Sequence, residues 1–318
     1  MADHIESKDI KVVLAGLDNA GKSSYLIALR KKYNFWEKVA NLKPTIKIDY
    51  STCNILGKYM LNIWDMGGQE KYRKVYLDHP VYFENTDVIL FLIDIQDEIR
   101  FETSVKYLHE VLEIYRDLEY NNEINICFHK FDPEIKNLEE YEARKQMLKD
   151  LIKKVNPDMS FKFFETSFYN IYSLTKALSS SLNKIIFLEE ANKKLIEFGT
   201  KYTCDYIILF TRQGLIIADF YKEIVDPHEY DTKIIPKINE DLEFFQELTD
   251  ERVKITEKLD FTEDFFTYVT MFQTQPLGRE GRPATLFLSL KALRMEGSVD
   301  LVKSNVLSLL ESIKVIII

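Results

Sequence analysis

The sequence predicts an α/β fold with a mostly parallel sheet of six strands, followed by a smaller α+β domain. Short apolar runs rich in β-branched residues alternate with amphipathic segments of helical period over about residues 1–185, a pattern typical of a parallel sheet covered on both faces. After about residue 187 the pattern changes to strands in antiparallel order flanked by helices. The length of 318 residues provides for about two domains, each with its own core.

The strands of the first domain are predicted from their apolar runs. Residues 87–94 (DVILFLID) are almost wholly apolar, as expected for a central strand buried on both faces. Residues 46–55 and 59–65, joined through Leu56–Lys58, predict an antiparallel hairpin. The remaining strands are expected at 10–16, 124–130 and 161–167, and helices after Gly21, over 101–118 and 138–155, and from about Asn170.

A long amphipathic helix over about 184–201 leads into the second domain. Two strands at 205–211 and 215–221 follow, joined by a tight turn at Arg212–Gly214. Further strands are expected near 264–273 and 284–291, and helices over 236–250 and 298–313.

We place the two domains at 1–187 and 188–318. No Gly/Ser/Pro-rich linker separates them, so we expect the second domain to pack on the first through the helix around 171–201.

Composition and charge exclude several classes of protein. With 46% hydrophobic and 29% charged residues, the chain is not disordered, collagen-like or a coiled coil. Its 42 Lys+Arg against 51 Asp+Glu give a net charge of −9, which disfavours a non-specific nucleic-acid binder. Residues 1–188 carry 26 Lys+Arg and 28 Asp+Glu, a net charge of −2, whereas 189–318 carry 16 and 23, a net charge of −7.

Targeting signals are not evident in the sequence. No run reaches about 18 apolar residues, and the acidic start is unlike a signal peptide. Ala2 stands where myristoylation needs Gly, and the last residues include no prenylation cysteine. The three cysteines lie far apart and fit reduced thiols better than a disulfide framework or a zinc site. We expect a cytoplasmic protein that reaches a membrane surface only through partners.

The segment Gly16–Ser23 (GLDNAGKS) satisfies GxxxxGK[ST] at every position, between an apolar strand and a helix. Backbone N–H groups of such a loop cradle phosphates, with the partial positive charge of the helix N-terminus. Lys22 adds a charge against the β and γ oxygens, and Ser23 offers a hydroxyl to Mg²⁺. The alternative is a glycine-rich turn that merely joins strand to helix, but pattern and context together favour a phosphate site.

A second motif is Trp64–Glu70 (WDMGGQE). Asp65 ends a strand, where a carboxylate can hold a Mg²⁺-bound water. Gly68 lacks a side chain, so its N–H can approach a γ-phosphate, and Gln69 is placed to orient the attacking water. Thr45, between the first helix and the second strand, is a candidate for the second hydroxyl on Mg²⁺, although alone it is only a loop threonine.

A third motif is His129–Asp132 (HKFD), directly after a predicted strand. The Asp132 carboxylate can accept hydrogen bonds from guanine N1–H and N2–H₂, whereas adenine offers no donor at N1 and leaves it unpaired. The stem of Lys130 can lie along the base face. Ser167 and Phe168 follow the last strand, where backbone N–H groups can meet guanine O6. Taken alone, either segment is explained by a solvated loop.

In this order, the motifs resemble those of small Ras-superfamily GTPases. GLDNAGKSS and WDMGGQEKYR resemble the Arf family, whereas HKFD, with His129 where most relatives carry Asn, resembles the Rag (Gtr) family. The long stretch between Ser23 and Thr45 and the second domain also resemble the Rag family. The resemblance implies a P-loop G domain over 1–187 and a roadblock/longin-like dimerisation domain over 188–318.

The resemblance assigns roles residue by residue. It implies catalytic roles for Gln69 and Lys22 and magnesium binding by Ser23, Thr45 and Asp65. It implies that GTP or GDP is bound by Asp18, Asn19, Ala20, Gly21, Lys22, Ser23, Ser24, Thr45, Gly68, His129, Lys130, Asp132, Ser167 and Phe168. His129 replaces the Asn that normally ties the base loop to the phosphate loop. The lipidated amphipathic N-terminus of Arf proteins is missing.

These features predict a switch that binds GTP with Mg²⁺ and hydrolyses it, acting as a homo- or heterodimer through the C-terminal domain. No arginine is evidently placed as an internal finger, so we expect slow intrinsic turnover, with exchange and GTPase-activating proteins as partners. A nucleotide-binding scaffold that does not hydrolyse GTP is the alternative, left open by His129. An ATP-using P-loop enzyme is disfavoured by Asp132.

Overall fold

The computed structural model describes residues 8–30, 45, 47–55, 59–186, 188–212, 216–223, 233–250, 256–274 and 285–317. The chain divides into two compact units, one formed by Asp9–Cys53 with Met60–Ser181 and a second built on Leu182–Ile318. The predicted boundary at residues 187 and 188 lies near this division and stays a prediction. None of the helices in the described part is long and apolar enough to cross a membrane.

The first unit alternates strands with helices. In chain order its elements are β1 (Lys8–Ala15), α1 (Lys22–Arg30), β2 (Ile48–Ile55), β3 (Tyr59–Met66), α3 (Glu70–Asp78), the short 3₁₀ turn η1 (Pro80–Tyr82), β4 (Val88–Asp94), the 3₁₀ turn η2 (Glu98–Arg100), α4 (Phe101–Asp117), β5 (Ile124–His129), α5 (Glu139–Val155), β6 (Phe161–Thr166) and α6 (Ile171–Ile186).

Six strands form the sheet of this unit, in the order β2-β3-β1-β4-β5-β6. β4 pairs in parallel with β1 and with β5, and β5 pairs in parallel with β6. This confirms the predicted α/β fold with a mostly parallel six-stranded sheet. β2 and β3 are neighbours, while the turn predicted at Leu56–Lys58 lies outside the described residues. Ile46, at the start of the predicted strand 46–55, also lies outside them.

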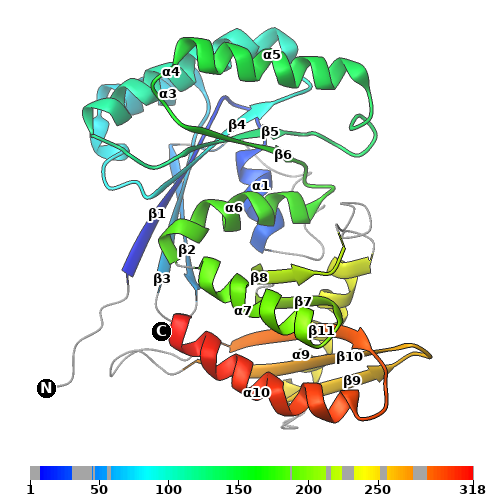
Figure 1. The fold of residues 1–318 in the computed structure, drawn as a ribbon. Coiled ribbons are helices and arrows are strands. Elements are labelled where there is room, and N and C mark those ends of the chain that lie inside the picture. The colour runs from blue at the N-terminus through cyan, green and yellow to red at the C-terminus, as the bar shows by residue number, and fades with distance from the viewer. Residues whose placement is uncertain are drawn as a thin grey trace, which may run out of the picture. The chain divides into compact units, whose positions relative to one another are not determined.

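Helices cover both faces of this sheet: α3, α4 and α5 lie on one face and α1 and α6 on the other (Figure 1). The Tyr25 hydroxyl of α1 donates to the Leu174 carbonyl of α6 at 2.7 Å. β4 is buried along almost its whole length, as the apolar run predicts, because helices pack on both of its sides. The carboxyl ends of parallel strands meet at one edge of such a sheet, which is where ligands bind in open α/β folds.

The second unit is a five-stranded antiparallel sheet in the order β8-β7-β11-β10-β9. Its elements are α7 (Leu188–Lys201), β7 (Cys204–Thr211), β8 (Ile216–Tyr221), α9 (Ile235–Asp250), β9 (Glu257–Phe261), β10 (Phe265–Gln273), β11 (Thr285–Leu293) and α10 (Ser298–Ile317). α7 and α10 cover one face and α9 the other (Figure 1). The predicted turn after Arg212 falls at Gln213–Gly214, outside the described residues.

Candidate nucleotide site

The phosphate-loop motif lies between the end of β1 and the start of α1. Its backbone is left-handed at Asn19, with φ 62°, and positive at Gly16 and Gly21, with φ 137° and 89°. A Cβ at Gly16 would lie 2.3 Å from the Leu92 carbonyl oxygen of β4, and a Cβ at Gly21 would lie 2.4 Å from the His129 ring. Glycine is therefore required at both positions by backbone conformation and by space.

Lys22 bends back over the loop. It is 6% exposed, and its Nζ donates to the carbonyls of Gly16 at 3.0 Å and Leu17 at 2.7 Å. Burial lowers the pKa of Lys22 to about 8, although Asp65 and Asp18 act in the opposite direction. Main-chain oxygens thus hold the Lys22 ammonium at the loop. In this position it can form an ion pair with a bound anion.

Three oxygen-bearing side chains converge next to this lysine. Ser23 Oγ donates to Asp65 Oδ2 at 2.5 Å and lies 2.8 Å from Thr45 Oγ1, which itself lies 3.3 Å from Asp65 Oδ2. Asp65 is 1% exposed, and its Oδ1 has no hydrogen-bond partner among the described residues. Burial raises the pKa of Asp65, against the effects of Lys22 and the two hydroxyls.

This donor set fits a magnesium ion. Hydroxyl and carboxylate oxygens are the ligands that Mg²⁺ prefers, usually with retained waters and substrate phosphates. The orphaned buried Oδ1 supports the fit, because a buried acceptor without a partner is costly unless a cation or a donor meets it. That Ser23, Thr45 and Asp65 hold Mg²⁺ stays a prediction.

The segment after β3 touches the phosphate loop. The Asp18 N–H donates to the Gly68 carbonyl at 3.0 Å, and a Cβ at Gly68 would lie 2.2 Å from that nitrogen. Gln69 follows as the N-cap residue of α3, and its side chain makes no capping hydrogen bond. The side-chain amide of Gln69 therefore does not cap α3.

The base motif follows β5. His129 is fully buried, and its Nδ1 lies 3.0 Å from Thr166 Oγ1. Its Nε2 has no hydrogen-bond partner among the described residues and would lie 2.7 Å from a Cβ at Gly21. Burial lowers the pKa of His129 to about 3. The ring therefore meets the phosphate loop as a neutral group in packing contact.

Asp132 has one partner on each carboxylate oxygen. Ser167 Oγ donates to Oδ1 at 2.5 Å, and Gln96 Nε2 donates to Oδ2 at 2.9 Å. A carboxylate oxygen accepts more than one hydrogen bond, so both remain able to face a base. Lys130 has φ 59°, and its Nζ pairs with Asp94 at 2.6 Å.

The prediction that backbone N–H groups after β6 meet guanine O6 stays a prediction. In the structure the Ser167 N–H donates to Ser173 Oγ at 3.0 Å. A hydroxyl near the start of α6 thus satisfies this donor, and Ser167 contributes through its own hydroxyl on Asp132. Phe168 lies beside this loop and stacks on Tyr169, with ring centroids 4.7 Å apart.

Comparison with known proteins decides the family. The profile of the Gtr1/RagA G protein conserved region matches residues 11–250, which is more than half of the chain. The chain belongs to the Gtr1/RagA G-protein family. The match extends beyond the first unit into the second, whose roadblock fold is not confirmed by it.

One curated protein and one solved structure are similar to parts of this Rag-type small G protein. ADP-ribosylation factor-like protein 3 of Caenorhabditis elegans is 36% identical over 106 residues, which are 33% of this chain and 53% of that protein. The chain thus spans about half the length of this relative. The Arl6 BBS3 small GTPase of Trypanosoma brucei, solved with the nucleotide analogue GppNp, has a TM-score of 0.45 at 19% identity and covers 56% of this chain and 97% of that one.

No sequence motif marks residues 94–100, which lead from the end of β4 to α4 in this Rag-type G protein. Besides the Asp94–Lys130 pair and the Gln96–Asp132 hydrogen bond, Gln96 Nε2 donates to the Lys130 carbonyl at 2.7 Å. At the other end, the Arg100 guanidinium contacts Asp18. Only the position of this segment in the sequence could have indicated a role in the site, because it follows the carboxyl end of the central parallel strand, where ligands bind in open α/β folds.

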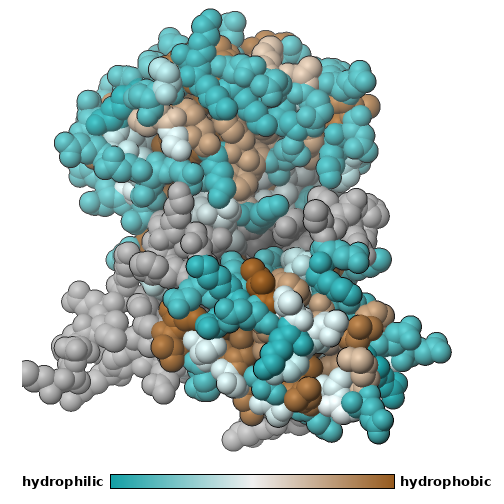
Figure 2. Space-filling model, in the orientation of Figure 1, coloured by the Kyte–Doolittle hydropathy of each residue, from teal (hydrophilic) through white to brown (hydrophobic). Residues whose placement is uncertain are grey.

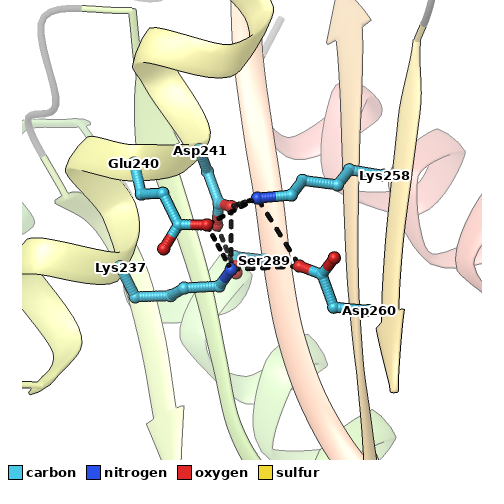
Figure 3. Close-up of polar contacts among 6 residues, drawn as sticks. All are labelled: Lys237, Glu240, Asp241, Lys258, Asp260 and Ser289. Carbon is cyan, nitrogen blue, oxygen red and sulfur yellow. Dashed lines mark hydrogen bonds and ion pairs between the residues drawn. The ribbon is translucent and has the colours of Figure 1, made fainter.

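A second group of charged side chains, of which Asp241 is fully buried, lies within the C-terminal unit between α9 and the sheet (Figure 3). Carboxylate oxygens of Glu240, Asp241 and Asp260 all lie within 4.8 Å of one another. Lys258 Nζ lies 3.2 Å and Lys237 Nζ 3.4 Å from Asp241 Oδ1. Burial alone would lower the pKa of Lys237, but Asp241 and its acidic neighbours raise it overall. The two ammonium groups already supply the cations that these carboxylates need.

Proposed function

We propose that this protein binds GTP and GDP with Mg²⁺ and hydrolyses GTP, acting as a molecular switch. The observation that carries the proposal is the convergence of Ser23, Thr45 and Asp65 within 3.3 Å of one another, beside the phosphate loop. Backbone N–H groups of the loop and Lys22 hold the phosphates. Ser23, Thr45 and Asp65 would hold Mg²⁺, which would help to neutralise the negative charge of the phosphates.

The base is recognised by Asp132. Its two oxygens are oriented by Ser167 and Gln96 and accept hydrogen bonds from guanine N1–H and N2–H₂. Adenine would leave the carboxylate partly unpaired.

Competitive binding of GTP, GDP and ATP, with and without Mg²⁺, tests this proposal. Wild type is expected to prefer guanine nucleotides, and Asp132→Ala to weaken GTP binding by at least about 100-fold, because two charge-assisted hydrogen bonds are lost. Asp158→Ala is the matched control, since Asp158 is an exposed carboxylate of the same unit paired with Arg116. Equal binding of ATP and GTP would exclude the guanine site.

Hydrolysis is tested separately by single-turnover measurements. Gln69 is proposed to orient the attacking water, so Gln69→Leu is expected to slow hydrolysis about tenfold or more while GTP affinity stays the same. Slow intrinsic hydrolysis is expected, and an activating partner would raise its rate by about 10³–10⁵-fold.

A nucleotide-binding scaffold is the second candidate, favoured by the buried His129 ring, whose Nε2 makes no hydrogen bond with the described part of the phosphate loop. Wild type that binds GTP without hydrolysing it, and a Gln69→Leu variant equal to wild type, would support the scaffold.

The C-terminal unit is proposed to pair two chains, identical or different. Apolar residues stand among polar ones on the face formed by α7 and α10 (Figure 2). Leu301 and Leu307 of α10 are 55% and 63% exposed, and exposed apolar surface of this kind marks interaction sites when it is contiguous. Analytical ultracentrifugation of the full chain is expected to show a dimer, and a strict monomer at high concentration would contradict the pairing.

Exchange proteins and GTPase-activating proteins are the proposed partners. Nucleic acid is not proposed as a partner. It places the protein in the cytoplasm, with membrane contact only through partners. Reduced thiols support this location, since Cys127 and Cys204 are free and buried. Cell fractionation with and without the partners tests it.

A further inference from the structure

Asp18 places a negative charge inside the loop that, under the proposed function, holds phosphates. It is the third residue of the motif and follows Leu17, whose carbonyl binds the Lys22 ammonium at 2.7 Å. Its side chain is 47% exposed. An unpaired carboxylate at this position repels phosphate oxygens, and the repulsion grows with the number of phosphate charges.

The guanidinium of Arg100 contacts Asp18 with both arms. One nitrogen donates to the Asp18 main-chain carbonyl at 3.0 Å, and the other forms a close ion pair with the Asp18 carboxylate. Such a two-point contact neutralises the charge of Asp18 and also fixes the orientation of the two groups. A lysine, with a single point of contact, would neutralise the charge only. Arg100 therefore neutralises the side chain and fixes the main chain of the loop at one residue.

Asp18 also touches the segment after β3. Its N–H donates to the Gly68 carbonyl at 3.0 Å, and the same carbonyl accepts from Arg73 Nε at 3.0 Å. The sequence predicts that the Gly68 N–H approaches the γ-phosphate. A change in the position of Asp18 would therefore also move Gly68, next to the γ-phosphate that distinguishes GTP from GDP.

Arg100 is well anchored for this role. It ends the 3₁₀ turn η2, where its N–H donates to the Asp97 carbonyl at 3.1 Å. At the start of the same segment, Asp94 pairs with Lys130 at 2.6 Å. The guanidinium is therefore presented to Asp18 by a segment that is itself tied to the base loop.

We propose that Arg100 is a positioning residue that sets the preference of the site for triphosphate over diphosphate by neutralising Asp18. The inference rests on the proposed nucleotide binding and adds a determinant of specificity to it. Without Arg100, the Asp18 carboxylate faces the phosphates unpaired. The extra charge of GTP then makes its loss of affinity larger than that of GDP.

A double-mutant cycle on the full-length protein tests this role. Equilibrium binding of GTP and of GDP, each with Mg²⁺, is measured for wild type, Arg100→Ala, Asp18→Asn and the double variant. Arg100→Ala is expected to weaken GTP binding about tenfold and GDP binding about threefold or less. Adding Asp18→Asn is expected to restore GTP binding to within about twofold of wild type, because the charge that needed neutralising is gone.

Two further variants keep the test decisive. Arg100→Lys keeps the charge without the fork and is expected to fall between wild type and Arg100→Ala. Arg116→Ala removes an arginine of the same unit that pairs with Asp158, and it is expected to leave both affinities unchanged. Thermal unfolding of each variant without nucleotide reports whether the fold is intact.

The outcomes separate the explanations. Equal losses of GTP and GDP affinity in Arg100→Ala would overturn the proposed preference. Failure of Asp18→Asn to restore binding would also overturn it and assign Arg100 to the phosphates directly. Wild type that binds neither nucleotide would overturn the proposed function, and this inference with it, whatever the variants do.

Discussion

The two units each bury an aspartate, and the surroundings of the two carboxylates differ. Asp65 of the first unit is 1% exposed and is met by two hydroxyls and the nearby Lys22, and its Oδ1 has no hydrogen-bond partner within the described ranges. Asp241 of the second unit is 0% exposed and is met by two lysine ammonium groups and the hydroxyl of Ser289 at 3.4 Å (Figure 3).

The difference is the one expected between a site proposed to bind a ligand and a group that stabilises the fold. Burial raises the pKa of both carboxylates, so a shifted pKa alone does not tell them apart. The partners do. Hydroxyls satisfy a carboxylate only partly and are themselves ligands for a cation, whereas two ammonium groups neutralise the charge within the protein.

The largest expected effect comes from removing the charge of Asp65. Asp65→Asn is expected to lower Mg²⁺-dependent GTP hydrolysis about 100-fold, because the carboxylate proposed to help hold Mg²⁺ beside the phosphates is lost. It is also expected to make GDP release insensitive to chelation of Mg²⁺. Stopped-flow release with and without EDTA measures this, and a release rate that still rises on chelation would remove Asp65 from the magnesium site.

The same substitution in the second unit sharpens the comparison. Asp241→Asn leaves Lys237 and Lys258 facing an uncharged amide, and it is expected to destabilise that unit by about 3 kcal/mol. Hydrogen exchange of the β10 and β11 amides reports the loss, while GTP affinity is expected to stay at the wild-type value. A loss of nucleotide binding without a change in exchange would contradict the structural role of Asp241.

A pH dependence is expected from the first unit, which buries His129. Its folded pKa of about 3 lies below the unfolded value of about 6.5, so the unfolded chain takes up a proton first as pH falls. Stability is therefore lost progressively on acidification from pH 6.5 towards 3, by about 2 kcal/mol at pH 5. The slope of stability against pH is compared between wild type and His129→Asn, and identical slopes would refute the assignment.

The smallest expected effect concerns Gln96, which orients the Asp132 carboxylate. Gln96→Ala is expected to weaken GTP and GDP binding equally, about threefold to tenfold, because one hydrogen bond to a charged group is lost. Gln146→Ala is the matched control, since Gln146 Nε2 donates to an exposed aspartate, Asp150, at 2.9 Å. A Gln96 variant that resembles this control would show that Ser167 alone orients Asp132.

Much of the fold was predictable because apolar periodicity is a local signal. The runs expected at 87–94 and 205–211 are the buried strands β4 and β7. β9 (Glu257–Phe261) was missed, because this edge strand is largely exposed and carries no apolar alternation.

The parts of the candidate site that lie in motifs were predictable, because the chemistry of phosphate binding requires certain residues at a fixed spacing in the sequence. The phosphate loop and Asp65 stand in recognisable motifs, and the structure brings Ser23, Thr45 and Asp65 together. Gln96 and Arg100 lie in no such motif, and their contacts with Asp132 and Asp18 depend on the pairing of β4 with β1 and β5. Only the folded sheet reveals them.

The close approach of Gly16 to β4 has a mechanical consequence. Its α-carbon faces the Leu92 carbonyl with no room for even a methyl group, so the start of the phosphate loop is wedged against the central strand. Any residue larger than glycine at position 16 would therefore have to push the start of the loop away from β4, and the geometry of the loop would change with it.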